Sequence, residues 1–153
     1  MATGSVSAID REEWQLIESK SASGTSVTFN AFSGYKHLWL TGKAITKSGA
    51  TGIAVRPNNN STVGNYVAGA ENGADTLFFI SGGIATSQAA SFKIYDVDKT
   101  TPKQVSCSYS YVVPQNEHDA FVDPVAVTSL VVLTYNGTAT FTGGTFYLYG
   151  IVA

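Results

Sequence analysis

The final stretch of the sequence, residues 144–152, is an aromatic segment that reads Gly-Thr-Phe-Tyr-Leu-Tyr-Gly-Ile-Val. Large aromatic side chains gain stability from burial, and a frayed terminus would leave them in water. We therefore expect a buried strand here, paired with a segment far back in the sequence. The first stretch of similar character is residues 14–18, Trp-Gln-Leu-Ile-Glu, so the chain is predicted to close on itself.

A period of two governs the chain from Trp14 onward. In residues 36–47, the even-numbered positions from Leu38 to Ala44 form one face, and the odd-numbered positions from His37 to Lys43 form the other. This alternation is typical of a half-buried strand. Runs of the same kind predict further strands at residues 14–19, 26–31, 53–56, 76–80, 91–95, 104–113 and 125–135.

Short segments rich in Gly, Asn, Pro and Ser separate these strands, and such residues favour turns. No window shows a convincing helical stripe of apolar residues. Eight or nine short strands with frequent turns predict an all-β fold, an antiparallel β-sandwich of the jelly-roll or a related Greek-key kind. Residues 1–13 lack apolar periodicity and are interpreted as an N-terminal arm, whereas residues 14–153 form the predicted single β-sandwich domain.

Charged residues make up only 13% of the chain, against about a quarter in an average protein, and Gly, Ser, Thr and Asn take their place. Such a surface suits a protein that packs into a larger assembly, so we expect an oligomer. The net charge is -2, and the nine Lys and Arg residues are scattered singly. Binding to nucleic acid depends on clustered positive charge, and we therefore expect no nucleic-acid partner.

The first residues have neither the positive start nor the apolar run of a signal peptide. No stretch approaches the roughly 18 apolar residues of a membrane span, so no membrane partner is predicted. We expect the protein to be made in the cytoplasm. Its lone cysteine, Cys107, has no partner for an internal disulfide and is expected to pack as a small apolar residue.

The chain is poor in the residues that catalysis needs. It has two histidines, His37 and His118, and no Gly-x-Ser-x-Gly elbow. Residues 116–119 and Asp123 gather oxygen atoms and an imidazole, but their spacing matches no known metal-binding loop. No phosphate-binding loop and no pair of cysteines for zinc is present, and no pair of carboxylates is singled out for glycosidase chemistry. We predict no catalytic residues, no cofactor and no metal.

Candidate contacts with a partner come from two places. Aromatic residues on a solvent face, such as Trp39, Tyr66 and Tyr95, could stack on a sugar or anchor a protein interface. The alternative for each is a position in the core or at its rim. In the arm, Arg11 and Glu12 are candidates for contact with a neighbouring subunit, and simple disorder of the arm is the alternative.

Three segments, taken in order, resemble a β-sandwich domain of bacteriophage virion proteins, found in tail-fibre tips and in small head or tail accessory proteins. The first runs from residues 14–18 through 27–29 to 35–42, the second comprises 53–58 and the Asn65-Tyr66 pair, and the third is 144–151. The resemblance spans about residues 14–152 and rests on short apolar and turn motifs. It implies a fold and a virion setting but carries over no catalytic residue. The chain departs from the family at residues 43–47, Lys-Ala-Ile-Thr-Lys, where the family often has a strand bearing arginine.

The leading hypothesis is a non-enzymatic structural protein of the phage virion, a capsid decoration or cement protein that stabilises the shell as a homotrimer. Its partners would be copies of itself and the major capsid protein or tail proteins. The hypothesis rests on the resemblance and on the shortness of the arm, because a receptor-binding tip normally follows a shaft on the same chain. The alternatives are a tail-fibre module that binds a receptor or a host surface glycan, and a small carbohydrate-active enzyme.

Overall fold

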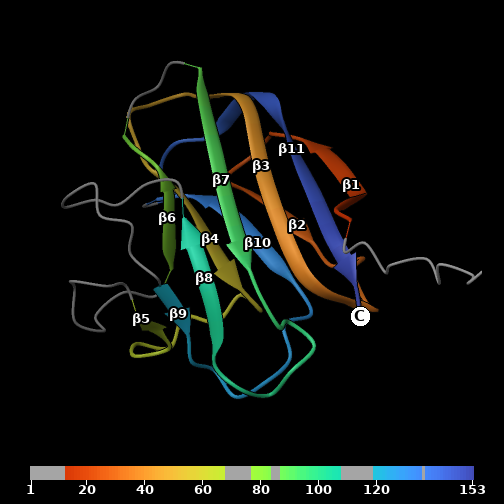
Figure 1. Cartoon of the computed structure of the whole chain (residues 1–153). Coiled ribbons are helices and arrows are strands. Elements are labelled where there is room, and N and C mark those ends of the chain that lie inside the picture. Colours follow the sequence, from red (N-terminus) through yellow and green to blue (C-terminus); the bar gives the residue numbers. More distant parts are fainter. Residues whose placement is uncertain (1–12, 68–76, 84–86, 108–118, 136) are drawn as a thin grey trace, which may run out of the picture.

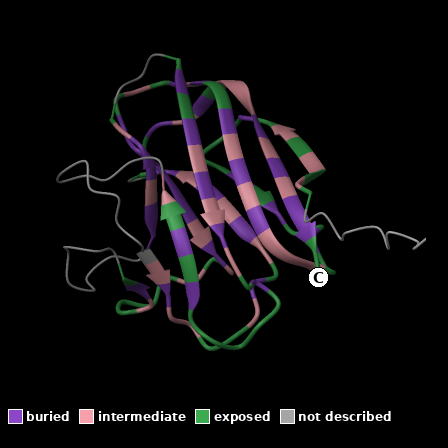
Figure 2. Ribbon diagram, viewed as in Figure 1, coloured by how far each residue is buried: buried purple, intermediate pink, exposed green. Residues whose placement is uncertain are grey.

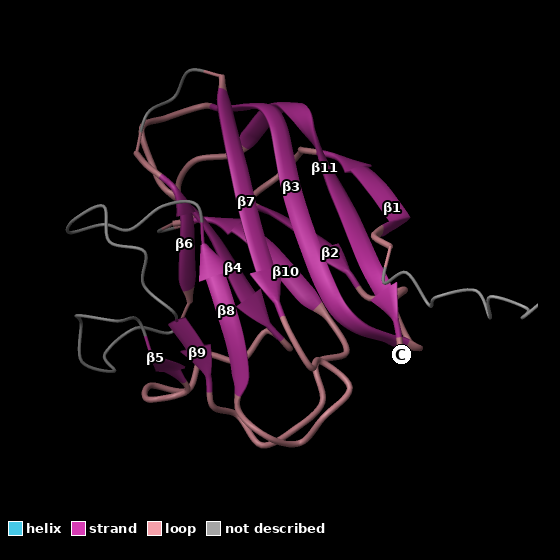
Figure 3. Ribbon diagram, viewed as in Figure 1, coloured by secondary structure: helices cyan, strands magenta, loops and turns pink. Residues whose placement is uncertain are grey.

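The computed structural model describes residues 13–67, 77–83, 87–107, 119–135 and 137–153 (Figure 1). In these residues the chain is all-β, with eleven strands and no helix (Figure 3). The seven-stranded sheet has the order β1 (Gln15–Ser21), β11 (Phe141–Val152), β3 (Tyr35–Lys47), β7 (Gln88–Ile94), β8 (Lys103–Cys107), β9 (Asp119–Phe121) and β5 (Tyr66–Val67). The four-stranded sheet has the order β2 (Ser26–Phe29), β10 (Leu130–Thr134), β4 (Ile53–Pro57) and β6 (Phe78–Ser81).

Every strand pair is antiparallel, and the two sheets enclose a shared apolar core, which confirms the predicted β-sandwich. Nine strands were expected from the alternation, and each has a counterpart among the described residues. Residues 108–113 of the predicted strand 104–113, and residue 76 of the predicted strand 76–80, lie outside the described residues. The two additional strands, β5 and β9, have two and three residues. Segments this short show no alternation in sequence, because a period of two needs four or more residues to be visible.

The aromatic strand β11 lies between β1 and β3, so the predicted closure of the chain on itself is confirmed (Figure 1). Gln15 is paired with Gly150, and Leu16 with Tyr149. On its other edge β11 pairs with β3 along almost its whole length. The strand therefore holds the first strand of the sandwich to its longest one.

Burial alternates along the central strands, as the bands on β3 and β7 show (Figure 2). Leu38, Leu40, Phe146 and Leu148 point into the core and are fully buried. The opposite sheet contributes inward residues such as Phe29, Val55, Leu130 and Val132. The half-buried Cys107 packs against this core, as a small apolar residue would.

The alternation along β3 breaks after Gly42, and the prediction that Ala44 lies on the same face as Leu38 is wrong. Ala44 has a left-handed backbone (φ 54°) and is exposed, whereas Ile45 is buried. On β11 the bulge is matched by Gly144 (φ 95°), where a Cβ atom would lie 2.7 Å from the carbonyl oxygen of Lys43 and closer still to that of Ala44. Only glycine fits there, and this paired irregularity reverses the inward and outward faces of β3 beyond it.

The bulge also turns Lys47 inward, at one end of the sandwich. Its ammonium group donates hydrogen bonds to the carbonyl oxygens of Thr51 and Gly82 (3.2 Å to Gly82) and to Oε1 of Gln88 (3.1 Å). Ser81 donates a further hydrogen bond to the same Gln88 oxygen (2.7 Å). Burial lowers the pKa of Lys47.

A second lysine, Lys103, is buried at the opposite end of the sandwich, where β8 begins. Among the described residues, its ammonium group donates only to main-chain oxygens, those of Thr101 (2.9 Å), Asp123 (3.1 Å) and Val125 (2.5 Å). Burial lowers the pKa of Lys103, and the charge of Asp123 opposes that shift. In the described part of the chain, no helix is long and apolar enough to cross a membrane.

Candidate functional site: an aromatic face on the seven-stranded sheet

The outer face of the seven-stranded sheet carries a cluster that we call the aromatic face, made of Trp14, Trp39, Lys93 and Tyr149. Strand register brings its parts together: Trp39 of β3 lies between Tyr149 of β11 and Lys93 of β7. Residues directly opposite each other on neighbouring strands point to the same face. Trp14, immediately before β1, completes the cluster through its ring contact with Trp39.

The three rings are packed on one another. The centroid of the Trp39 ring lies 5.7 Å from that of Trp14, edge to face, and 5.5 Å from that of Tyr149. The indole nitrogen of Trp39 donates a hydrogen bond to the hydroxyl of Ser91 (2.9 Å). This bond fixes the orientation of the indole, so the central ring is held in place by three neighbours.

Lys93 lies over the rings, with its ammonium nitrogen 4.8 Å from the centroid of Trp39 and 5.8 Å from that of Trp14. A cation over an indole contributes about 0.5–1 kcal/mol at an exposed site. Together, Lys93, Tyr149 and Trp14 occupy the surroundings of the Trp39 ring. A sugar that stacked on the Trp39 ring would have to displace the Lys93 ammonium group that lies over it.

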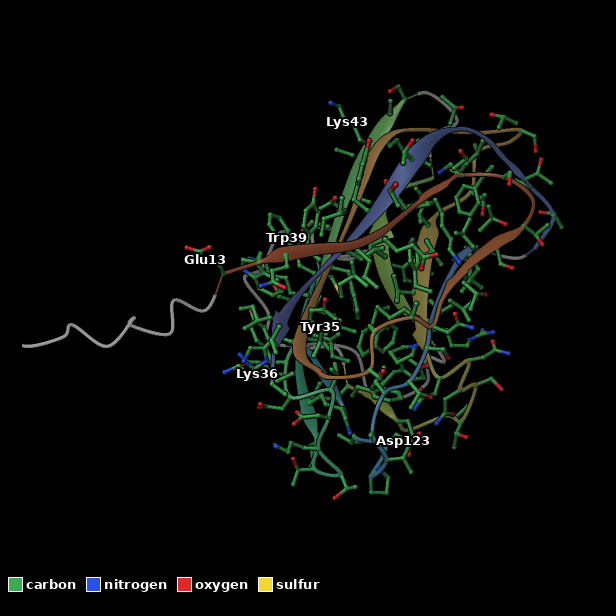
Figure 4. The ribbon with its side chains drawn as sticks, turned by 90° about the vertical axis from the view of Figure 1, so that its right-hand side faces the viewer. Glu13, Tyr35, Lys36, Trp39, Lys43 and Asp123 are labelled. Atoms are coloured by element: carbon green, nitrogen blue, oxygen red, sulfur yellow. The ribbon has the colours of Figure 1, made fainter. Side chains whose placement is uncertain are left out.

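The surroundings of the aromatic face are apolar on one side and cationic along β3. Leu16 lies beside Tyr149 in the same row across the sheet, and its side chain is 56% exposed. Figure 4 shows Lys36 and Lys43 on the same side of the molecule as Trp39, toward opposite ends of β3, with Glu13 near Trp39. The face thus combines large apolar groups with lysines.

His37 lies on the same side of the sheet but serves a structural contact. Its Nδ1 atom accepts a hydrogen bond from the main-chain nitrogen of Asp96 (3.1 Å), a residue with a left-handed backbone (φ 56°). Its ring packs on Tyr95 with centroids 5.2 Å apart. Because Nδ1 is engaged as an acceptor, His37 and half-buried Tyr95 position the turn after β7.

The acidic residues described by the structure are dispersed, and no three of His, Cys, Asp and Glu among the described residues come together as a metal site. Asp98 is paired with Lys99 (2.8 Å), and this hydrogen bond lowers the pKa of Asp98. The carboxylate of Asp123 accepts a hydrogen bond from the side-chain amide of Asn60. Residues 116–118, including His118, lie outside the described residues.

The candidate contact residues named from the sequence have different outcomes. Trp39 is the centre of the aromatic face. Tyr66, in contrast, is 1% exposed and packs in the core, with its ring 4.9 Å from that of Phe78 and 5.2 Å from that of Phe121. Its hydroxyl donates to the carbonyl oxygen of Asn60 (2.5 Å), and burial raises its pKa. Arg11 and Glu12 lie outside the described residues.

The correction for Tyr66 has a physical cause. Tyr66 begins a two-residue strand whose partner is Phe121, and that pairing turns its ring inward. Sequence reasoning also missed three members of the aromatic face, Trp14, Lys93 and Tyr149. The alternation along the last strand could have placed Tyr149 on the outer face, since it follows the core residue Leu148. The register between β11, β3 and β7, which brings Tyr149, Trp39 and Lys93 together, cannot be read from the sequence of any one strand.

A scan against models of known protein families finds no match to this chain, and a search of curated protein sequences finds none that is significantly similar.

Proposed function

We propose that this chain is a non-enzymatic structural protein of a bacteriophage virion, which binds another virion protein through the aromatic face. The role that we favour is decoration of the capsid, as a cement protein that works as a homo-oligomer. The virion setting comes from the resemblance of three ordered segments to phage β-sandwich domains. The observation that carries the binding role is the packed cluster of Trp14, Trp39, Tyr149 and Lys93 on an outer sheet face.

This cluster has the composition of an interface anchor. Protein interfaces concentrate their binding energy in a few Trp, Tyr and Arg residues, each of which costs about 2 kcal/mol or more when truncated. Binding also costs less when the contact residues are already ordered. The hydrogen bond from Trp39 to Ser91 and the rings packed around it provide that order before any partner arrives.

The chemistry of the face favours a protein partner over a glycan. Lys93 and two rings pack on Trp39, so a sugar could stack on the indole only by displacing one of them. An apolar partner surface rimmed by carboxylates would instead bury the rings and meet Lys43 and Lys93. Such complementarity of charge accelerates association and fixes orientation. The surface of a major capsid protein or a tail protein is the proposed partner, and the virion is the proposed location after synthesis in the host cytoplasm.

The test is binding of the purified protein to phage capsids that lack it, measured by co-sedimentation over a range of protein concentrations. Trp39→Ala is expected to weaken binding about 30-fold, which corresponds to about 2 kcal/mol. Val63→Ser is the matched control, because Val63 is an exposed apolar residue (63%) remote from the aromatic face, and it should bind as the wild type does.

Two results would contradict the proposal. One is capsid and tail binding that is unaffected by Trp39→Ala while near-ultraviolet circular dichroism shows the variant to be folded. The other is binding of the wild-type protein to a host-surface glycan, with loss of that binding in Tyr149→Ala. The second result would assign the chain to the receptor-binding class instead.

A further inference from the structure

The four-stranded sheet also has an outer face, and it is apolar in its centre. Strand register places Leu133 of β10, Ala54 of β4 and Phe79 of β6 side by side in one row. Ala54 is fully buried although it does not belong to the core cluster. It is thus covered on the outside of the sheet, among the side chains of this row.

The apolar row continues to Tyr135 through a ring contact. Tyr135, which follows β10, and Phe79 of β6 lie on either side of β4, and their ring centroids are 4.8 Å apart. Between them lies Gly52, whose carbonyl accepts the main-chain N–H of Tyr135 (2.9 Å); a Cβ on Gly52 would lie 3.1 Å from the Phe79 ring. The rings therefore fill the space above a residue without a side chain, and Tyr135 remains 42% exposed.

The charges on the two outer faces differ. The outward residues paired across the four-stranded sheet are Ser26, Thr28, Ala54, Arg56, Phe79, Val131 and Leu133. Arg56 is the only charged residue in that set. The face of the seven-stranded sheet carries Lys93 over its rings, Lys36 and Lys43 toward the two ends of β3, and Glu13 near Trp39, so that its lysines outnumber its acids (Figure 4). Two copies of the lysine-bearing face would repel each other, whereas two copies of the four-stranded face are compatible.

We propose that a second copy of this chain binds the outer face of the four-stranded sheet, about a two-fold axis along the row of Leu133, Ala54 and Phe79. Arg56 lies about 7 Å to one side of this row, two residues along β4, and Tyr135 lies about 7 Å to the other side. A two-fold rotation exchanges the sides. Arg56 of each copy then lies against the Phe79–Tyr135 rings of its partner, an arrangement that cations and aromatic rings favour.

The same axis keeps like charges apart. The two Arg56 side chains fall on opposite sides of the row, about 14 Å from each other, which exceeds the Debye length of about 8 Å at physiological ionic strength. An isologous contact of this kind gives a dimer. A trimer needs two different patches on each copy. The contact is independent of the partner that binds the aromatic face, so each inference can fail without the other.

The experiment is sedimentation equilibrium of the full chain. The wild-type protein is expected to have the mass of a dimer. The Leu133→Asp variant places a carboxylate on the two-fold axis of each copy and is expected to have the mass of a monomer. Val63→Asp, a charge on an exposed loop residue away from the row, should remain a dimer. Arg56→Ala should raise the dissociation constant about fivefold. A wild-type mass of a monomer or trimer, or a dimer that survives Leu133→Asp, would overturn the proposal.

A crosslinking measurement keeps the test decisive if Leu133→Asp does not fold. In a Cys107→Ser background, Leu133→Cys places a thiol next to its own copy across the axis. A short bis-maleimide should join these chains into a covalent dimer at low protein concentration, whereas Val63→Cys in the same background should stay monomeric. Equal crosslinking of the two variants would contradict the two-fold contact.

Discussion

The two ends of the sandwich are each closed by a buried lysine, but the two lysines are held in different ways. At the end with the bulge, Lys47 shares its hydrogen bonds between main-chain oxygens and the side chain of Gln88, which Ser81 also contacts. At the other end, Lys103 donates to three main-chain oxygens and to no side chain of the described residues. At the Lys47 end, the side chains of Gln88 and Ser81 can rearrange when one hydrogen-bonding group is lost. At the Lys103 end, the three carbonyl groups are fixed in the main chain, so they lose their shared donor when the lysine is removed.

The largest effect is expected at the bulge itself. Gly144→Ala should lower the free energy of unfolding by about 4 kcal/mol, because the new Cβ would collide with main-chain atoms of Lys43 and Ala44 that have no room to move. Gly137→Ala is the control, since Gly137 also has a positive φ (62°) but a Cβ added there would have nothing within 4 Å. It should cost about 1 kcal/mol. Equal losses in urea denaturation would show that backbone strain alone, without the collision, determines the cost.

At the end of the sandwich where β8 begins, Lys103→Met should lower the free energy of unfolding by about 3 kcal/mol. It leaves the oxygens of Thr101, Asp123 and Val125 without their common donor, in a place where the lysine is only 1% exposed. Lys99→Met changes an exposed lysine on the neighbouring turn and should stay within about 0.5 kcal/mol of the wild type. Chemical denaturation of both variants measures the difference, and a loss for Lys103→Met below that of Lys47→Met would reverse the comparison between the ends.

Lys47→Met should lower the free energy of unfolding by less, about 2 kcal/mol. The Gln88 oxygen that loses the lysine still accepts a hydrogen bond from Ser81. The double variant Lys47→Met with Gln88→Leu removes donor and acceptor together, so the losses should not add. A coupling energy of about 1 kcal/mol is expected from the double-mutant cycle. Strict additivity would show that the two side chains do not act as a unit.

The smallest effect concerns pH. Burial raises the pKa of Tyr66, so above about pH 10 the unfolded chain releases this proton while the folded chain keeps it. Its contribution to stability is therefore complete below pH 10 and declines above it, by at most about 1.4 kcal/mol per pH unit. Tyr66→Phe should remove that decline.

The buried lysines contribute to the pH dependence with the opposite sign, and they do so equally in both proteins that are compared. Burial lowers the pKa values of Lys47 and Lys103, so just below their ordinary value the unfolded chain holds more protons, and stability rises with pH there. Both variants of the comparison, wild type and Tyr66→Phe, keep these lysines. Identical slopes of unfolding free energy between about pH 9 and pH 11 would contradict the assignment to Tyr66.

Much of the fold follows from the sequence, because period-two alternation is a local property. It placed nine strands and paired residues 144–152 with the first strand, since residues 14–18 are the first stretch of similar aromatic and apolar character. The bulge was not predictable from β3 alone. The left-handed Ala44 requires Gly144, and these two residues are 100 positions apart in the chain.

The same limit applies to the candidate site. Trp39 was identified because it alternates with core residues in a long strand. The inward turn of Tyr66 and the burial of Lys103 depend on β9, a three-residue strand that pairs with both β5 and β8. Aromatic and charged residues at the ends of a sandwich take their orientation from such short contacts, which leave no periodic pattern in the sequence.

The position of β11 also affects how the protein folds during its synthesis on the ribosome. Because β11 lies between β1 and β3, neither of these earlier strands has its β11 neighbour until the segment up to Val152 has been synthesised. Pairing between residues so distant in sequence is slow, since long loops must close before any contact forms. During that delay the inner face of β3 and the rings of the aromatic face are open to other nascent chains. The sheet is therefore completed late, when β11 pairs with two strands that were synthesised before it.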